Sequence, residues 1–163
     1  MKLLGAGLIW TSLILVAGVY SVNLKKHVAL LNKTINMLSE MKVQLEYLNM
    51  PVFDMINKIN KSTGLDFLSE CIELISEGND FPTAWETSVN HAIYYKSAEK
   101  NELLQLGSNL GTSNRDNQIE IICMHKTAFE EFLIKAKTKE QKYGKLSITL
   151  GTLMGCMFFI MVI

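Results

Sequence analysis

The chain ends in an apolar run that no ordinary water-soluble fold requires. Residues 146–163 read LSITLGTLMGCMFFIMVI and contain no Asp, Glu, Lys, Arg, Asn, Gln or Pro. As a helix this run would be about 27 Å long, close to the hydrocarbon thickness of a bilayer, about 30 Å. The run therefore predicts a transmembrane helix over residues 146–163.

A group of lysines precedes this run. Lysines beside a membrane attract anionic headgroups, each contributing about 1 kcal/mol, so they form a candidate collar for anionic lipids. They also set the orientation of the span without binding anything, and both interpretations stay open. The collar consists of Lys135, Lys137, Lys139, Lys142 and Lys145.

A second apolar run lies near the N-terminus. Residues 3–22 read LLGAGLIWTSLILVAGVYSV and would form a helix about 30 Å long. The rival interpretation is a cleaved signal peptide, since Lys2 precedes the run and Val16, Ala17 and Gly18 offer a cleavage site. We favour a retained transmembrane helix, because the apolar region of a signal peptide is only about 7–15 residues long.

Lysine placement predicts the orientation of the two spans. Lys25, Lys26 and Lys33 follow the first span, the collar precedes the second, and no lysine follows residue 146. The positive-inside rule then places residues 23–145 in the cytoplasm, as a domain held to the cell membrane at both ends. The chain has three scattered cysteines, an odd count that does not suggest a disulfide framework and fits a reducing compartment.

The polar middle of the chain has helical periodicity. After the first span, apolar residues recur at three- and four-residue spacing up to residue 45, with Lys42 in the one gap: Leu24, Val28, Leu31, Ile35, Leu38 and Leu45. This stripe predicts one helix that continues from the span to about residue 48. It faces either the core of the domain, which we favour, or a second copy in a coiled coil.

Turn and cap residues divide the rest into further helices. Pro51, Gly64, Gly78, Pro82 and Gly111 mark the breaks, and nothing alternates as a strand would. In the helix after Asp80 we expect four residues on the inner side: Trp85, Val89, Ala92 and Ile93. The predicted fold is all-α: a membrane-anchored bundle of about six helices, whose first and last helices are continuous with the N- and C-terminal transmembrane helices.

The sequence carries no recognisable catalytic pattern. His27, His91 and His125 are isolated in the sequence, and His125 and Cys123 lie two residues apart, which separates them on a helix. The segment from Gly107 to Gly111 lacks the Lys-Ser/Thr ending of a phosphate-binding loop. We therefore expect no enzymatic activity, no metal and no cofactor, and the zero net charge gives no indication of nucleic-acid binding.

Two pairs of glycines are candidate contact positions. Gly151 and Gly155 form a G-x-x-x-G pattern that lets another membrane helix approach closely, either the first span or a span of another protein. Gly107 and Gly111 also lie four apart, next to leucines, and favour a tight helix contact followed by a sharp stop.

At this last segment the chain resembles the stage III sporulation protein AB family of endospore-forming bacteria. The shared residues include Lys2 to Ala6, Met50-Pro-Val, Ala84-Trp-Glu, Leu103-Leu-Gln-Leu-Gly-x-x-Leu-Gly, Arg115 and Gln118. Met50 stands where the family has a threonine, and Asn114 where it has an acidic residue. Both departures fall at helix starts, where Asn49 and Asn114 remain suitable caps.

The resemblance implies a function that the spacing alone does not. Members of the family act in the mother cell, in a secretion-like channel complex that links it to the forespore, and they are similar to the inner-membrane platform protein F of type II secretion. The implied role is a non-catalytic platform in the outer forespore membrane. The implied partners are other stage III sporulation proteins, membrane lipids and, by analogy, a secretion-type ATPase. The alternative is a membrane-anchored helical sensor or regulatory protein.

Overall fold

A computed structural model gives the structure of the chain. It describes the backbone of residues 2–48, 51–111 and 114–162, and the side chains of these residues except 2–17, 48, 144–148, 150–152 and 154–162. The predicted cap Asn49 lies outside the described residues, together with Met50.

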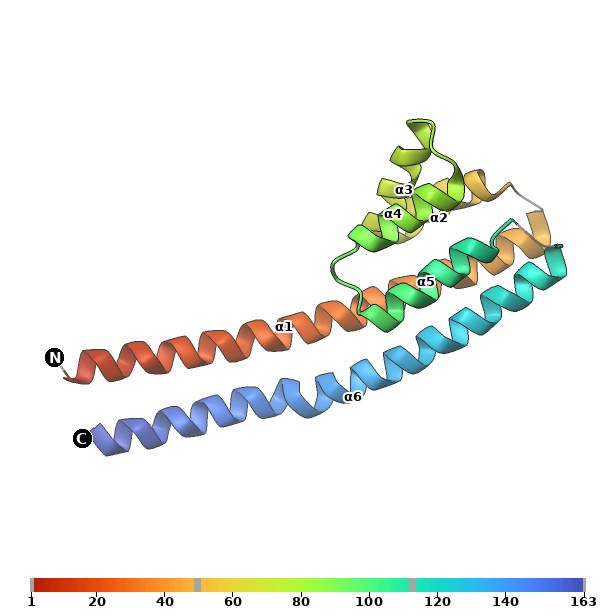
Figure 1. The fold of residues 1–163 in the computed structure, drawn as a ribbon. Helices are drawn as coiled ribbons and strands as arrows, with labels where there is room; N and C mark the ends of the chain where they lie inside the picture. The colour runs from red at the N-terminus through yellow and green to blue at the C-terminus, as the bar shows by residue number, and fades with distance from the viewer. Residues whose placement is uncertain (1, 49–50, 112–113, 163) are drawn as a thin grey trace. The chain divides into compact units, whose positions relative to one another are not determined.

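The described residues form six α-helices and contain no strand. In chain order these are α1 (Lys2–Val43), α2 (Val52–Thr63), α3 (Asp66–Ser76), α4 (Phe81–His91), α5 (Ser97–Asn109) and α6 (Arg115–Val162), and a π-helical turn (Gln44–Leu48) ends α1 (Figure 1). The all-α prediction is confirmed, and the first and last helices run continuously into the terminal segments. Helix starts follow the expected capping: the Asn114 side chain accepts a hydrogen bond from the backbone N–H of Asn117 at 3.1 Å.

The chain divides into two compact units. The central unit is Leu30–Leu133, and the terminal unit combines Met1–Ala29 with Ile134–Ile163. α1 and α6 each cross from one unit to the other, since each is a single long helix.

Among the residues that the structure describes, no helix is both long and apolar enough to cross a membrane. The predicted spans over residues 3–22 and 146–163 fall mostly on positions whose side chains lie outside the described ones. They therefore stay predictions.

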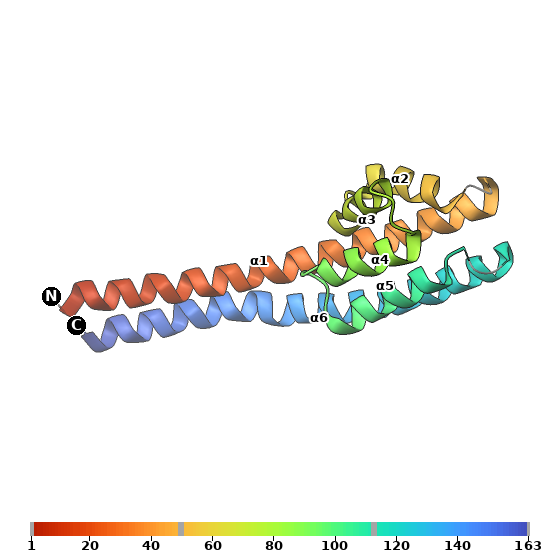
Figure 2. The same ribbon diagram turned by 45° about the horizontal axis from the view of Figure 1, so that its top comes forward.

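The central unit is built around the short helices α2 to α5. α3 packs between α2 and α4, and α4 packs against α5 (Figures 1 and 2). Each helix has an apolar face that it buries against its neighbours, as the periodicity predicts. The fully enclosed side chains include Leu31, Leu38, Ile56, Ile59, Leu68, Trp85, Leu103 and Phe129.

Two expectations about buried faces need correction. Ile93 was placed on the inner side of the fourth helix, but it is 78% exposed, because α4 already ends at His91 and the chain turns outward. The buried face of α1 also includes Thr34, Met37 and Met41, which lie beside the predicted stripe, while Ile35 is only half-buried.

Candidate functional site

In the central unit, a glycine in α5 allows α4 and α5 to pack closely together. The indole ring of Trp85 lies on Gly107, and a methyl group placed at Gly107 would be 2.1 Å from a ring carbon of Trp85. The indole Nε1–H also donates a hydrogen bond to the carbonyl oxygen of Leu103 at 2.7 Å. Gly107 thus provides space in α5 for a tryptophan from the neighbouring helix, which accounts for a glycine inside a helix.

Aromatic rings extend this junction to the other helices. The Phe67 ring of α3 meets Trp85 edge-on at a centroid distance of 5.5 Å and meets Tyr95 at 5.9 Å. The Tyr95 hydroxyl is 2.6 Å from the hydroxyl of Thr34 on α1. Such edge-to-face pairs add about 0.5–1.5 kcal/mol to the burial of the rings. The cluster therefore links α1, α3, α4 and α5.

Gly111 follows α5 and has a different role from Gly107. Its φ is +78°, in the left-handed region where a side chain is strained, and a methyl group there would lie 3.6 Å from a Val52 methyl carbon. Gly111 is exposed. The structure thus uses the two glycines separately, one for close packing and one for the turn before α6.

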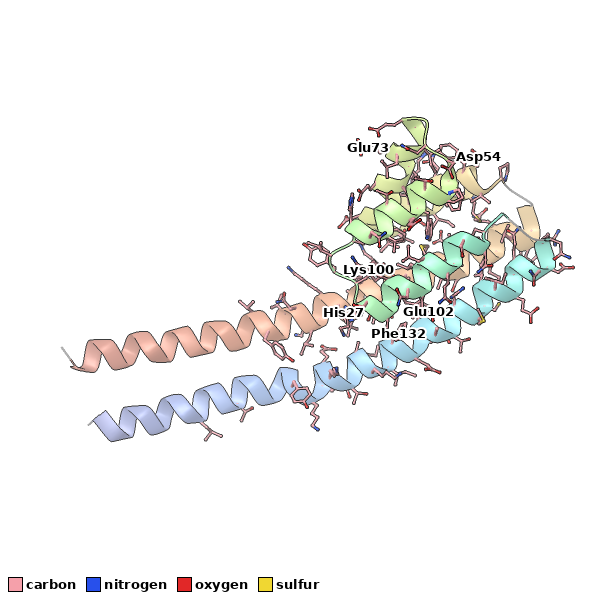
Figure 3. The ribbon with its side chains drawn as sticks, in the orientation of Figure 1. His27, Asp54, Glu73, Lys100, Glu102 and Phe132 are labelled. Atoms are coloured by element: carbon pink, nitrogen blue, oxygen red, sulfur yellow. The ribbon has the colours of Figure 1, made fainter. Side chains whose placement is uncertain are left out.

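Two histidines that are isolated in the sequence are paired in space. His91 Nδ1 lies 2.5 Å from a Glu70 carboxylate oxygen and joins α4 to α3. His125 Nδ1 lies 2.6 Å from a Glu102 carboxylate oxygen and joins α6 to α5, where Glu102 is labelled in Figure 3. His125 is only 1% exposed. Sequence spacing did not reveal these pairs, because their members lie more than 20 residues apart in the chain.

Two buried titratable groups near the junction, Cys71 and Tyr95, are held neutral. Burial raises the pKa of the Cys71 thiol from its usual 9.0 to about 11, against a smaller lowering by a hydrogen bond with Ser88. Burial also raises the pKa of the Tyr95 hydroxyl. A thiol with a raised pKa is a poor nucleophile, so this chemistry is structural. Among the described residues, no three His, Cys, Asp or Glu side chains come together as a metal site would require.

The lysine collar is exposed where the structure describes it. Lys135, Lys137, Lys139 and Lys142 have exposed side chains, and the Lys142 ammonium lies 5.5 Å from the centre of the Tyr143 ring. Helix α6 is continuous through the rest of the predicted sites. The side chain of Lys145 and the surroundings of Gly151 and Gly155 lie outside the described residues.

The terminal unit exposes large apolar side chains. Val19 is 61% exposed on α1, and Ile134 and Leu153 are 65% and 62% exposed on α6. The described part of the molecule thus shows close junctions between helices and several exposed apolar side chains.

Comparison with known proteins gives a family match and a structural match. The sequence model of the family described as stage III sporulation protein AB matches residues 2–163. A solved structure named stage III sporulation protein AB superposes with a TM-score of 0.60 at 21% sequence identity, over 69% of this chain and 94% of that one. The structural match shows a shared fold. A search of curated proteins found no match.

Proposed function

Because the chain belongs to the stage III sporulation protein AB family, we propose that it acts in endospore formation as a non-catalytic membrane platform. In this proposal the central unit is a rigid cytoplasmic body, and the two terminal segments, residues 3–22 and 146–163, anchor it in the outer forespore membrane on the mother-cell side. Its partners are other stage III sporulation proteins of the channel complex and a secretion-type ATPase.

Family membership over nearly the whole chain is the single observation that carries this proposal. It links the chain to sporulation, and the family is one of structural proteins rather than enzymes. The platform role within a channel complex goes beyond the family match and rests on the similarity to secretion platforms.

The chemistry of the described residues is compatible with a platform. A platform needs a body that keeps its shape while partners bind, and the aromatic cluster around Trp85 supplies such a body. It also needs anchors, and in this proposal the apolar ends of the long helices α1 and α6 would supply them. The collar lysines would then lie on the cytoplasmic side, where anionic lipids attract them.

A deletion strain tests the role in sporulation. We expect loss of the gene from its native endospore-forming host to reduce heat-resistant spores strongly, and complementation with the intact chain to restore them. Normal spore yield in the deletion strain would contradict the proposal. A complementing copy with exposed Glu120 changed to Gln, away from every junction, is the matched control and should restore sporulation fully.

The partner is tested by co-purification. The full-length chain, solubilised from membranes of engulfing cells, should retain other stage III proteins and an ATPase in stoichiometric amounts. Recovery of the chain alone, from cells in which sporulation depends on it, would favour the regulatory alternative over the platform.

A further inference from the structure

Helix α3 carries an acidic stripe along one exposed side. Asp66, Glu70, Glu73 and Glu77 follow one another at intervals of four, three and four residues, which places them on one face of a helix. Asp66, Glu73 and Glu77 are exposed, and Figure 3 labels Glu73 at the outer side of α3. The surrounding sequence strengthens the charge, since residues 62–95 contain six Asp or Glu and no Lys or Arg.

Helix α6 carries a basic stripe with the same spacing. Lys135, Lys139 and Lys142 follow at intervals of four and three residues and so share one face, while Lys137 lies on the opposite side. Both stripes repeat over seven residues, about 10 Å of helix. An acidic helix face and a basic helix face with matching intervals are complementary in charge and in register.

We propose that the α3 stripe of one copy of this chain binds the α6 lysine stripe of a second copy. The interface is heterologous, since two different faces meet, and it joins copies head to tail in the membrane. The proposal rests on the proposed membrane anchoring, which confines the copies to one surface.

The lysine stripe extends further from the predicted span than the lipid headgroups do. If residues 146–163 span the bilayer, Lys139 lies about 10 Å and Lys135 about 16 Å along the helix from the span. The headgroup layer is only about 5–8 Å thick, so both lysines extend beyond it.

The charge of the chain also favours a second copy. Six of the sixteen acidic residues lie in residues 66–86, and five of the sixteen basic residues form the collar, so each copy carries both complementary faces. Exposed ion pairs are individually weak, about 0.2–1 kcal/mol each. Confinement to one membrane raises the effective concentration enough for a few such pairs to matter.

Charge reversal on separate copies tests the interface. Full-length chains with donor or acceptor labels on N-terminal tags are reconstituted in neutral phosphatidylcholine vesicles, and association is measured by energy transfer as a function of protein density. We expect Glu73→Lys with Glu77→Lys to weaken association about tenfold, and Lys139→Glu with Lys142→Glu to do the same. An equal mixture of the two variants should associate as the native chain does, because each reversed face then meets its reversed partner.

Matched controls separate the stripes from general charge effects. Lys137→Glu, on the opposite side of α6, and Glu86→Lys, exposed on the neighbouring α4, should change association less than twofold. Restoration in the mixture also shows that both variants are folded.

Three results would overturn the inference. Association could be unchanged in each charge-reversed variant alone, or it could fail to recover in the mixture. The lysine variant could also change association only in vesicles that contain anionic lipid. The last would mean that the stripe binds lipid. Chains that fail to insert into vesicles would contradict the membrane anchoring itself, whereas chains that insert without pairing would contradict only this interface.

Discussion

The central and terminal units differ in where their described apolar side chains lie. In the central unit, large apolar side chains such as Trp85, Phe129 and Leu103 are enclosed by protein. In the terminal unit, Val19, Ile134 and Leu153 are more than half exposed. The enclosed residues of the central unit are stabilised by their neighbours in the chain, while these three described residues of the terminal unit are not.

Because of this difference, we expect the central unit to determine the stability of the fold and the terminal unit to determine membrane association. Burial of apolar surface, at about 25 cal/mol per Å², holds the central unit together through its own contacts. If the predicted spans lie in a membrane, the same effect acts on the exposed Val19 and Leu153 through the bilayer. Substitutions in the two units should therefore affect two different measurements.

Loss of the central aromatic gives the largest expected effect. Trp85→Ala removes a fully enclosed ring and its hydrogen bond to Leu103, and we expect the free energy of unfolding to fall by about 3–5 kcal/mol. Urea unfolding of the purified full-length chain in detergent measures this. Membrane association should not change. A parallel loss of membrane association would show that the two units are not independent.

A charge in the terminal unit should give the converse result. Leu153→Arg places a charge in the predicted span and should disfavour insertion by about 3 kcal/mol, which reduces the membrane-bound fraction. Unfolding of the central unit should stay as it is. Leu153→Ala is the control for loss of the side chain alone, and equal retention of the Arg and Ala variants would mean that Leu153 lies outside the bilayer.

The same substitution, glycine to alanine, can be compared in the two units. Gly107→Ala places a methyl group against the Trp85 ring and should cost about 1–3 kcal/mol. Gly18→Ala, in the terminal unit, meets no atom within 4 Å and should cost nothing, since Ala is the better helix former. Equal stability of the two variants would contradict the tight α4–α5 junction.

A change to alkaline pH tests the burial of Cys71, and its effect on stability is absent at neutral pH. The folded state raises the pKa of Cys71 from 9.0 to about 11, so it holds the thiol proton more tightly than the unfolded chain does. Stability should be fully retained below pH 9 and fall as the pH rises towards 11, by up to about 1.4 kcal/mol per pH unit. Cys71→Ala should flatten this decline, and an unchanged curve would show that the thiol does not contribute.

The sequence predicted the helices better than the contacts between them. Periodicity and cap residues located the helices, including the starts at Asp80 and Asn114, because these signals are local. The contact of Gly107 with Trp85 was not predictable, because Trp85 lies 22 residues earlier, in a different helix. The pairs of His91 with Glu70 and His125 with Glu102 were missed for the same reason.

The error at Ile93 has a related cause. A helical pattern was extended past His91, where α4 ends, and the signal for that end is a backbone turn at Ala92 with ψ of 85° rather than a glycine or proline. The family itself was predicted from a combination of motifs and is confirmed by the match over residues 2–163.

Alkaline carbonate extraction of membranes that contain the full-length chain tests the membrane platform most directly. The account predicts that the chain stays in the membrane pellet at its full length, because two apolar segments hold it there. Release of the intact chain into the supernatant, or recovery of a form shortened near Gly18, would contradict it.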